Sequence, residues 1–244
     1  MRYLLFTLLT LIPFSAYTQV VDIESDRGGD KQGVHGSSEF GLSLQRGNVQ
    51  VFQTQAGLRL DYIKGIHHSL FIGSISYGEE DSEPFKNEMY SHTRWTAMWL
   101  KHIGTEIFSQ TQKDEFRLLQ IRQLTGAGLR LTVFDSLLAL GVGGMSDYEQ
   151  IEGRNKGVGA FRGSSYVRVG KEWKNGVKGQ MIAYYQPLFS DPSDYRILGV
   201  GSVEFKLDKV FSVVNEFNYA YDTRPPEEVI NDDLQIRVKF KVKW

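Results

Sequence analysis

A ladder of cations near the end of the chain is the feature that most clearly suggests chemistry. Apolar residues fill the positions between its members, from Leu234 to Trp244. Successive side chains of an extended strand point to opposite faces, so one face of this segment is cationic and the other is apolar. A cationic face either attracts anions or pairs with carboxylates on neighbouring strands. The ladder consists of Arg237, Lys239, Lys241 and Lys243.

Carboxylates that suit the second role occur on the segments expected to flank the ladder. Glu216 and Asp222 precede it, and Glu39 lies on the first segment, which would meet the last one on closure of a barrel. We favour a structural ion-pair network, because opposed charges lie on adjacent strands. A cationic stripe that selects anions in a pore is the alternative. The predicted residues of the lumen are Arg59, Glu216, Arg237, Lys239 and Lys241.

A hydrolytic site would need a nucleophile beside a general base. His102 and Ser109 are the pair that best fits a membrane-embedded phospholipase-type hydrolase, because His102 is expected on a strand within reach of Ser109 on the next one. No asparagine lies nearby in sequence to orient the histidine, and such sites are defined by geometry. We predict no catalytic residue and expect that the chain is not an enzyme.

Three segments resemble metal sites only superficially. His67 and His68 are adjacent, so on a strand their side chains point apart. The acidic segment 79–83 has no ligand spacing typical of a calcium site, and the acids within 22–30 carry Arg27 where an EF-hand turn needs glycine. We predict no metal and no cofactor.

The composition excludes several classes of protein. The chain has 244 residues, a formal net charge of −1 and no cysteine. There is no basic excess of the kind that binds nucleic acid, no disulfide framework and no thiol nucleophile. High glycine and aromatic contents with only 6 prolines favour strands joined by tight turns.

The N-terminus has the form of a secretory signal. Arg2 precedes an apolar run at 3–12, which is too short for a permanent membrane helix. We predict a signal peptide at 1–18 with cleavage before Gln19, followed by a short polar segment at 19–35. No later apolar run reaches the ~18 residues that a membrane-spanning helix needs.

Period-two alternation continues through the rest of the chain, and turn-forming pairs such as Asn175-Gly176 interrupt it. Counting the runs predicts about twelve strands of ~10 residues, the length of a tilted membrane-spanning strand. We predict an all-β fold, a closed antiparallel up-and-down transmembrane barrel over residues 36–244. A soluble lipocalin-type barrel is the alternative fold. The expected strand centres are Phe40, Gly57, Ser74, Ala97, Phe108, Gly126, Val142, Val167, Ala183, Gly201, Asn215 and Val238.

The expected connections alternate in length. The hairpin at Gly47-Asn48 is an exception, and the poorly alternating region 104–123 is compatible with a brief helix at 116–121. Outer-membrane barrels have short periplasmic turns and long outer loops, so both termini are expected on the periplasmic side. Short turns are expected at 64–68, 103–105, 135–136, 174–176 and 208–209. Long polar loops are expected at 78–91, 147–160, 189–194 and 222–232.

Several motifs resemble those of a known family. They are "GLSLQRGN" at 41–48, "GAGLRL" at 126–131, "LALGVGG" at 138–144, "YAYDTRPP" at 219–226 and the final "NDDLQIRVKFKVKW". In this order they resemble the YdiY-like family of salt-induced outer-membrane proteins, which is defined by a domain of unknown function. The resemblance implies an outer-membrane barrel with no established activity.

Three functions agree with these features. The first is a small, porin-like channel or passive barrel of the Gram-negative outer membrane. The second is a structural or adhesion barrel with a filled lumen and partner-binding loops, and the third is the hydrolase. The expected partners are outer-membrane lipid, lipopolysaccharide, and the barrel-assembly machinery through the strand ending in Trp244. Candidate interfacial aromatic residues are Tyr62, Trp95, Trp99, Trp173, Tyr185, Tyr221 and Trp244.

Overall fold

A computed structural model describes residues 32–46, 50–134, 137–173, 176–226 and 229–244. These residues form twelve strands and one short 3-10 helix, η1 (Glu115–Arg117). The strands are β1 (Gly33–Gln45), β2 (Val51–Lys64), β3 (His67–Glu80), β4 (Glu83–Met98), β5 (Ile103–Asp114), β6 (Leu119–Val133), β7 (Leu138–Ile151), β8 (Val158–Glu172), β9 (Val177–Leu188), β10 (Asp191–Lys206), β11 (Phe211–Asp222) and β12 (Asp232–Lys243).

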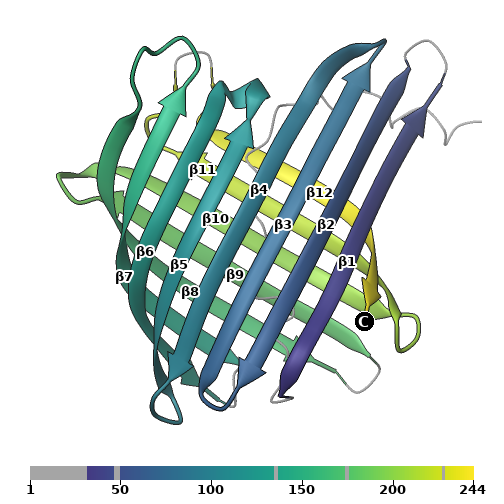
Figure 1. The fold of residues 1–244 in the computed structure, drawn as a ribbon. Helices are drawn as coiled ribbons and strands as arrows, with labels where there is room; N and C mark the ends of the chain where they lie inside the picture. Colours follow the sequence, from purple (N-terminus) through teal and green to yellow (C-terminus); the bar gives the residue numbers. More distant parts are fainter. Residues whose placement is uncertain (1–31, 47–49, 135–136, 174–175, 227–228) are drawn as a thin grey trace, which may run out of the picture.

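Each strand pairs antiparallel with the next one, and β12 pairs with β1 (Figure 1). The predicted closed antiparallel barrel of about twelve strands is therefore confirmed, and each expected strand centre lies in a different strand. Within the described ranges, no helix is long and apolar enough to cross a membrane. Below, the terminus end is the end where β1 begins and β12 finishes, and the loop end is the opposite one.

The connection predicted at 78–91 is wrong in length. Strand β3 continues to Glu80 and β4 begins at Glu83, so only Asp81 and Ser82 form the turn. Their φ values are 48° and 70°, and positive φ at both central residues is what a two-residue type I′ hairpin requires. The polar residues that suggested a loop belong instead to strand ends.

Three further connections differ from the prediction. The loop expected at 147–160 spans only 152–157, because β7 continues to Ile151 and β8 begins at Val158. The connection expected at 189–194 consists of residues 189–190 alone. The turn expected at 103–105 lies at 99–102, and 103–105 belong to β5. The longest connections between strands are 152–157, which is fully described, and 223–231, which is described except for residues 227–228. Both lie at the loop end.

The irregular region around residue 116 contains a single helical turn. The Asp114 side chain accepts a hydrogen bond from the Arg117 backbone N–H at 3.2 Å, and Leu118 ends the turn with a φ of 58°. Strand β6 begins at Leu119, so the helix expected at 116–121 forms only at its start. Register shifts in β5–β6 and β6–β7 explain the poor alternation there.

Some predictions fall outside the described residues. These are the signal peptide at 1–18, residues 19–31 of the polar segment, the hairpin at Gly47-Asn48, the turn at 135–136 and residues 174–175 of the turn expected at 174–176. Strand β1 begins at Gly33, three residues before the predicted start of the barrel at residue 36.

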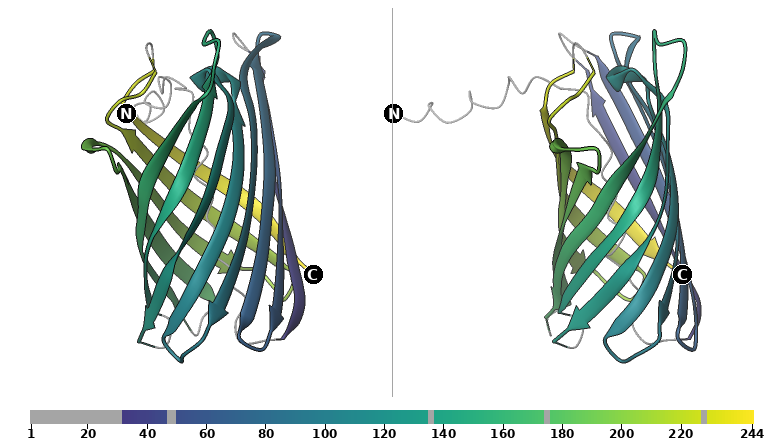
Figure 2. Two further views of the ribbon diagram at one scale, coloured as in Figure 1. Left: turned by 60° about the vertical axis from the view of Figure 1, so that its left-hand side comes forward. Right: turned by 90° about the vertical axis from the view of Figure 1, so that its left-hand side faces the viewer.

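The barrel is flattened. It is broad relative to its height in Figure 1 and narrow in the right-hand view of Figure 2. In Figure 1 the front strands run steeply and cross the more inclined β8–β12 behind them. Buried apolar residues of β3 and β4 form one cluster with residues of β8–β11, so the core of the protein lies in the lumen. The main members of this cluster are Leu70, Ile72, Tyr90, Tyr166, Ile182, Tyr184, Val200 and Ala220.

Candidate functional site: the charged interior of the barrel

Charged side chains line the inside of the barrel, while apolar side chains face outward. On β12 the exposed fractions of Ile236 and Phe240 are 73% and 64%, whereas those of Arg237 and Lys241 are 9% and 2%. In a closed barrel the buried set must point into the lumen, because period-two alternation leaves no other place for it. The structure buries all of the predicted lumen residues, Arg59, Glu216, Arg237, Lys239 and Lys241.

The cationic ladder is paired with carboxylates from both neighbouring walls. Glu216 on β11 accepts hydrogen bonds from Arg237 Nη2 and Lys239 Nζ, each at 2.7 Å. Lys239 Nζ also donates to Glu39 on β1 at 2.9 Å. Lys241 Nζ lies 3.4 Å from Glu204 on β10. These contacts form the seam network, which joins β10, β11, β12 and β1.

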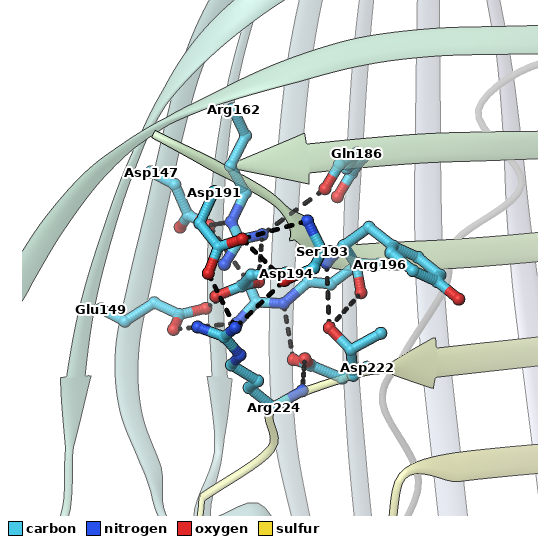
Figure 3. Close-up of polar contacts among 12 residues, drawn as sticks. Asp147, Glu149, Arg162, Gln186, Asp191, Ser193, Asp194, Arg196, Asp222 and Arg224 are labelled. Carbon is cyan, nitrogen blue, oxygen red and sulfur yellow. Dashed lines mark hydrogen bonds and ion pairs between the residues drawn. The ribbon is translucent and has the colours of Figure 1, made fainter. Parts of the chain in front are cut away.

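A second network lies towards the loop end and was not predicted from the sequence. Arg196 on β10 donates to Asp222 at 2.6 Å and to Glu149 at 2.7 Å, while Arg162 on β8 donates to Asp194 at 2.8 Å (Figure 3). Asp147 on β7 has contacts within 3.2 Å with three arginines, Arg122, Arg162 and Arg196. The only sequence signal for this network is that charged residues of β6, β7, β8 and β10 occupy the alternate positions whose side chains point into the lumen.

A third group of polar contacts links β5, β6 and β8 inside the lumen. The Tyr166 hydroxyl on β8 donates to Glu106 on β5 and accepts from Arg130 on β6, each at 2.7 Å. A Cβ atom on Gly141 of β7 would overlap the Tyr166 ring, so this glycine makes room for the tyrosine. The "LALGVGG" motif therefore has a packing role in the lumen.

Contacts also join opposite sides of the barrel. Arg117 of η1 lies 3.7 Å from Asp233 at the start of β12, about half the circumference away in strand order. Tyr90 and Ile182 belong to one buried cluster although they lie on β4 and β9. The lumen is thus crossed by side chains both at its loop end and at its centre.

Arg59 forms a separate contact on its own strand. It donates through Nε to Asp61 at 2.7 Å, and His68 Nε2 lies 2.6 Å from the same carboxylate. His67 points outward and stacks on Trp95 with a ring separation of 5.5 Å. The two adjacent histidines therefore point apart, as expected for neighbours on a strand.

The pair considered for hydrolysis is not brought together. His102 lies in the turn before β5 and its Nδ1 is 3.0 Å from the Thr132 carbonyl oxygen. Ser109 is seven residues further along the chain on β5, which at ~3.4 Å per residue separates the two by roughly 20 Å. The expectation that they lie within reach of each other is wrong, because His102 is not on a neighbouring strand.

The candidate interfacial aromatic residues fall into two groups. Tyr62, Trp99, Trp173 and Trp244 are exposed at the terminus end. Trp95, near the end of β4, lies at the same end but is half-buried. Tyr185 and Tyr221 lie near the loop end and pack against Tyr195, with ring separations of 5.6 Å and 6.1 Å. Two aromatic levels separated by an apolar band are typical of membrane barrels.

Two of the solved structures to which this chain is similar are domains of autotransporters. The translocator domain of the autotransporter NalP from Neisseria meningitidis is 7% identical, with coverage of 91% of each chain and a TM-score of 0.50. The β domain of the Bordetella autotransporter Brka is 11% identical, with coverage of 87% of this chain and 98% of that chain and a TM-score of 0.40. At these identities the likeness concerns the fold alone. No curated protein sequence matches this chain.

The family resemblance inferred from the motifs is confirmed at the level of sequence. A family described as "Protein of unknown function, DUF481" matches residues 38–244, which include nearly the whole barrel. The chain belongs to the DUF481 family.

Proposed function

We propose that this protein is an outer-membrane barrel with a closed lumen, which serves as a structural or partner-binding element rather than as a pore. The observation that carries this proposal is the set of contacts between opposite walls. The buried cluster shared by β3–β4 and β8–β11 occupies the space through which a solute would have to pass.

The size and flattening of the barrel explain why its lumen can be filled. Barrels of eight strands are filled by their own side chains, whereas those of sixteen or more leave an aqueous channel. Twelve strands lie between these limits, and flattening brings the walls close enough for tyrosine and arginine side chains to meet. The mixture of cations and carboxylates inside also argues against an anion-selective pore, because Glu216 and Glu39 neutralise much of the charge of the ladder.

The outer face supports a location in the outer membrane. Its exposed side chains are largely apolar, including Ile236, Val238 and Phe240 on β12. The start of β1 and the finish of β12 lie at one end, which suits a chain delivered from the periplasm. We expect fractionated cells to retain the mature protein, beginning near Gln19, in the outer membrane. Recovery of the folded, detergent-free barrel in the soluble periplasm would contradict the proposed location.

Planar-bilayer recording tests the closed lumen. The unmodified protein should give no stepwise conductance. Replacing Tyr90 and Tyr184 together by alanine removes two rings from the central cluster and should produce conductance steps. The matched control replaces the outward-facing Tyr62 and Tyr185 by alanine and should remain silent, with heat-modifiable electrophoretic mobility as the check on folding. Stepwise conductance by the unmodified protein would refute the closed lumen.

A further inference from the structure

The barrel is closed by an unusually short seam. Strands β1 and β12 share four residue pairs, from Ser37↔Lys243 to Phe40↔Phe240. By contrast, β1 pairs with β2 along its whole length, from Gly33 to Gln45. Towards the loop end the two seam strands diverge (Figure 1), and neither continues the ladder beyond Phe40↔Phe240 in the described residues.

A cavity lies against this seam on the inside. Its volume is about 50 Å³, room for ~3–4 water-sized groups. Its lining comes from strands β1, β2, β3, β11 and β12. The cavity therefore adjoins both β1 and β12, the two strands that diverge at the seam. The charged residues in the lining comprise four cations and two carboxylates: Arg59, Arg237, Lys239, Lys241, Glu39 and Glu216.

Arg237 provides the most direct indication of a ligand. Its side chain is 8% exposed, and its Nη2 atom donates a hydrogen bond to Glu216 at 2.7 Å. The buried Nε and Nη1 atoms have no hydrogen-bond partner among the described residues. Buried polar groups are normally satisfied, and an unpaired one is costly. A guanidinium offers planar, paired donors that match the oxygens of a phosphate group.

The surroundings of the cavity indicate that such a phosphate would belong to a lipid. Leu42 and Leu44 on β1 are 67% and 69% exposed beside the part of the seam that is not paired. On the other side, β12 presents Ile236 and Val238 outward. Apolar side chains therefore border the seam outside the wall, while cations lie just inside it. A phosphate ester inside the wall with acyl chains outside would contact both surfaces.

We propose that the cavity at the β1–β12 seam binds the phosphate of an anionic lipid from the membrane leaflet at the loop end. Arg237 and Lys239 hold the phosphate oxygens, and the acyl chains lie against Leu42 and Val238. The inference rests on the proposed function, since it requires the apolar outer face to lie in a bilayer. The loop-end leaflet is then the outer one, so the expected ligand class is a phosphorylated glycolipid.

The test is lipid binding to the purified, delipidated barrel in detergent, followed by native mass spectrometry. The probes are an acylated glucosamine disaccharide with two phosphates, the same lipid without phosphates, and inorganic phosphate. The phosphorylated lipid should bind at least ~10-fold more tightly than the other two, as expected for charge-assisted hydrogen bonds combined with apolar contact. Equal binding of the two lipids would overturn the proposal, and equally tight binding of inorganic phosphate would assign the cavity to a free anion.

Variants separate the two parts of the proposed site. Arg237→Lys keeps the charge but loses the paired donors, and should weaken phosphorylated-lipid binding ~10-fold. Arg162→Lys is the matched control, because Arg162 is a similarly buried lumen arginine outside this cavity. Unchanged binding by Arg237→Lys, or an equal loss in the control, would refute the role of the guanidinium.

A second pair of variants avoids changes in the buried network. Leu42→Ser with Leu44→Ser should weaken lipid binding several-fold, whereas Ile107→Ser, which is also outward-facing but lies on β5, should not. If the seam pair binds lipid as the unmodified protein does, the lateral placement of the acyl chains is wrong. Fractionation and conductance test the proposed function separately from lipid binding. If the protein is in the outer membrane and gives no conductance but binds both lipids equally, the lipid site is refuted and the proposed function stands.

Discussion

Replacing Glu216 by glutamine tests whether the cationic ladder depends on its carboxylate partners. The Glu216 carboxylate accepts hydrogen bonds from Arg237 and Lys239 at 2.7 Å each and from Asn218 at 2.8 Å. Glutamine keeps one acceptor oxygen but places an NH₂ group against cationic donors. The two buried cations then lose their main counter-charge.

The expected loss of unfolding free energy follows from this geometry. Removing one partner of a buried ion pair typically costs about 3–5 kcal/mol, because the remaining charge stays desolvated. The lower end of that range applies here, since Lys239 retains Glu39 at 2.9 Å. Conductance should stay absent, because the substitution removes no side chain from the central cluster.

Urea titration of the barrel in lipid vesicles, monitored by tryptophan fluorescence, measures this loss. The matched control is Glu80→Gln, at an exposed carboxylate at the end of β3, which should change stability by less than about 0.5 kcal/mol. Adding Lys239→Met to Glu216→Gln should restore part of the stability, since removing both charges relieves the unpaired state. If Glu216→Gln is as harmless as the control, the seam network is not a structural ion-pair network.

The two remaining predictions concern facing and pH. Val238→Arg should destabilise the barrel by about 2–4 kcal/mol in the same titration, because it places a charge on the outer face. Ser43→Arg should cost much less, because the Ser43 side chain is on the inward face of β1. Equal losses of stability would contradict the assigned faces. Hydrogen bonds from the backbone N–H groups of Phe211 and Val210 hold the pKa of Asp208 below its ordinary value. The ionised Asp208 therefore stabilises the turn at pH values above its pKa in the unfolded chain. This stabilisation is lost as the pH falls through the pKa of the folded protein. A carboxyl ¹³C titration with a midpoint at or above the ordinary aspartate value would refute the cap.

The sequence determined the strands and their faces because both are local properties. Alternation with a period of two is visible wherever one face is apolar and the other is polar, as from Leu234 to Trp244. The same signal could not locate strand ends. Near Glu80 and Glu83 both faces are polar, so strand and loop have the same composition, and only backbone pairing shows that the hairpin is tight.

The seam contacts were partly predictable, because β11 and β12 are consecutive strands and their inward residues must meet. The pairing of Arg59 with Asp61 also has a sequence signal, since residues two apart share a face of a strand. The network around Asp147 had no comparable signal. Its partners Arg122, Arg162 and Arg196 come from three other strands, and their meeting depends on register and curvature.

The contacts between opposite walls, on which the proposed closed lumen rests, were decided by tertiary structure alone. Arg117 and Asp233 lie 116 positions apart in sequence, and their contact depends on flattening of the barrel. Alternation fixes which side chains point inward, but it contains no information about the distance between opposite walls. That distance follows from strand tilt, from the small residue at Gly141 and from the volumes of the rings that meet inside. These quantities exist only when all twelve strands are in place.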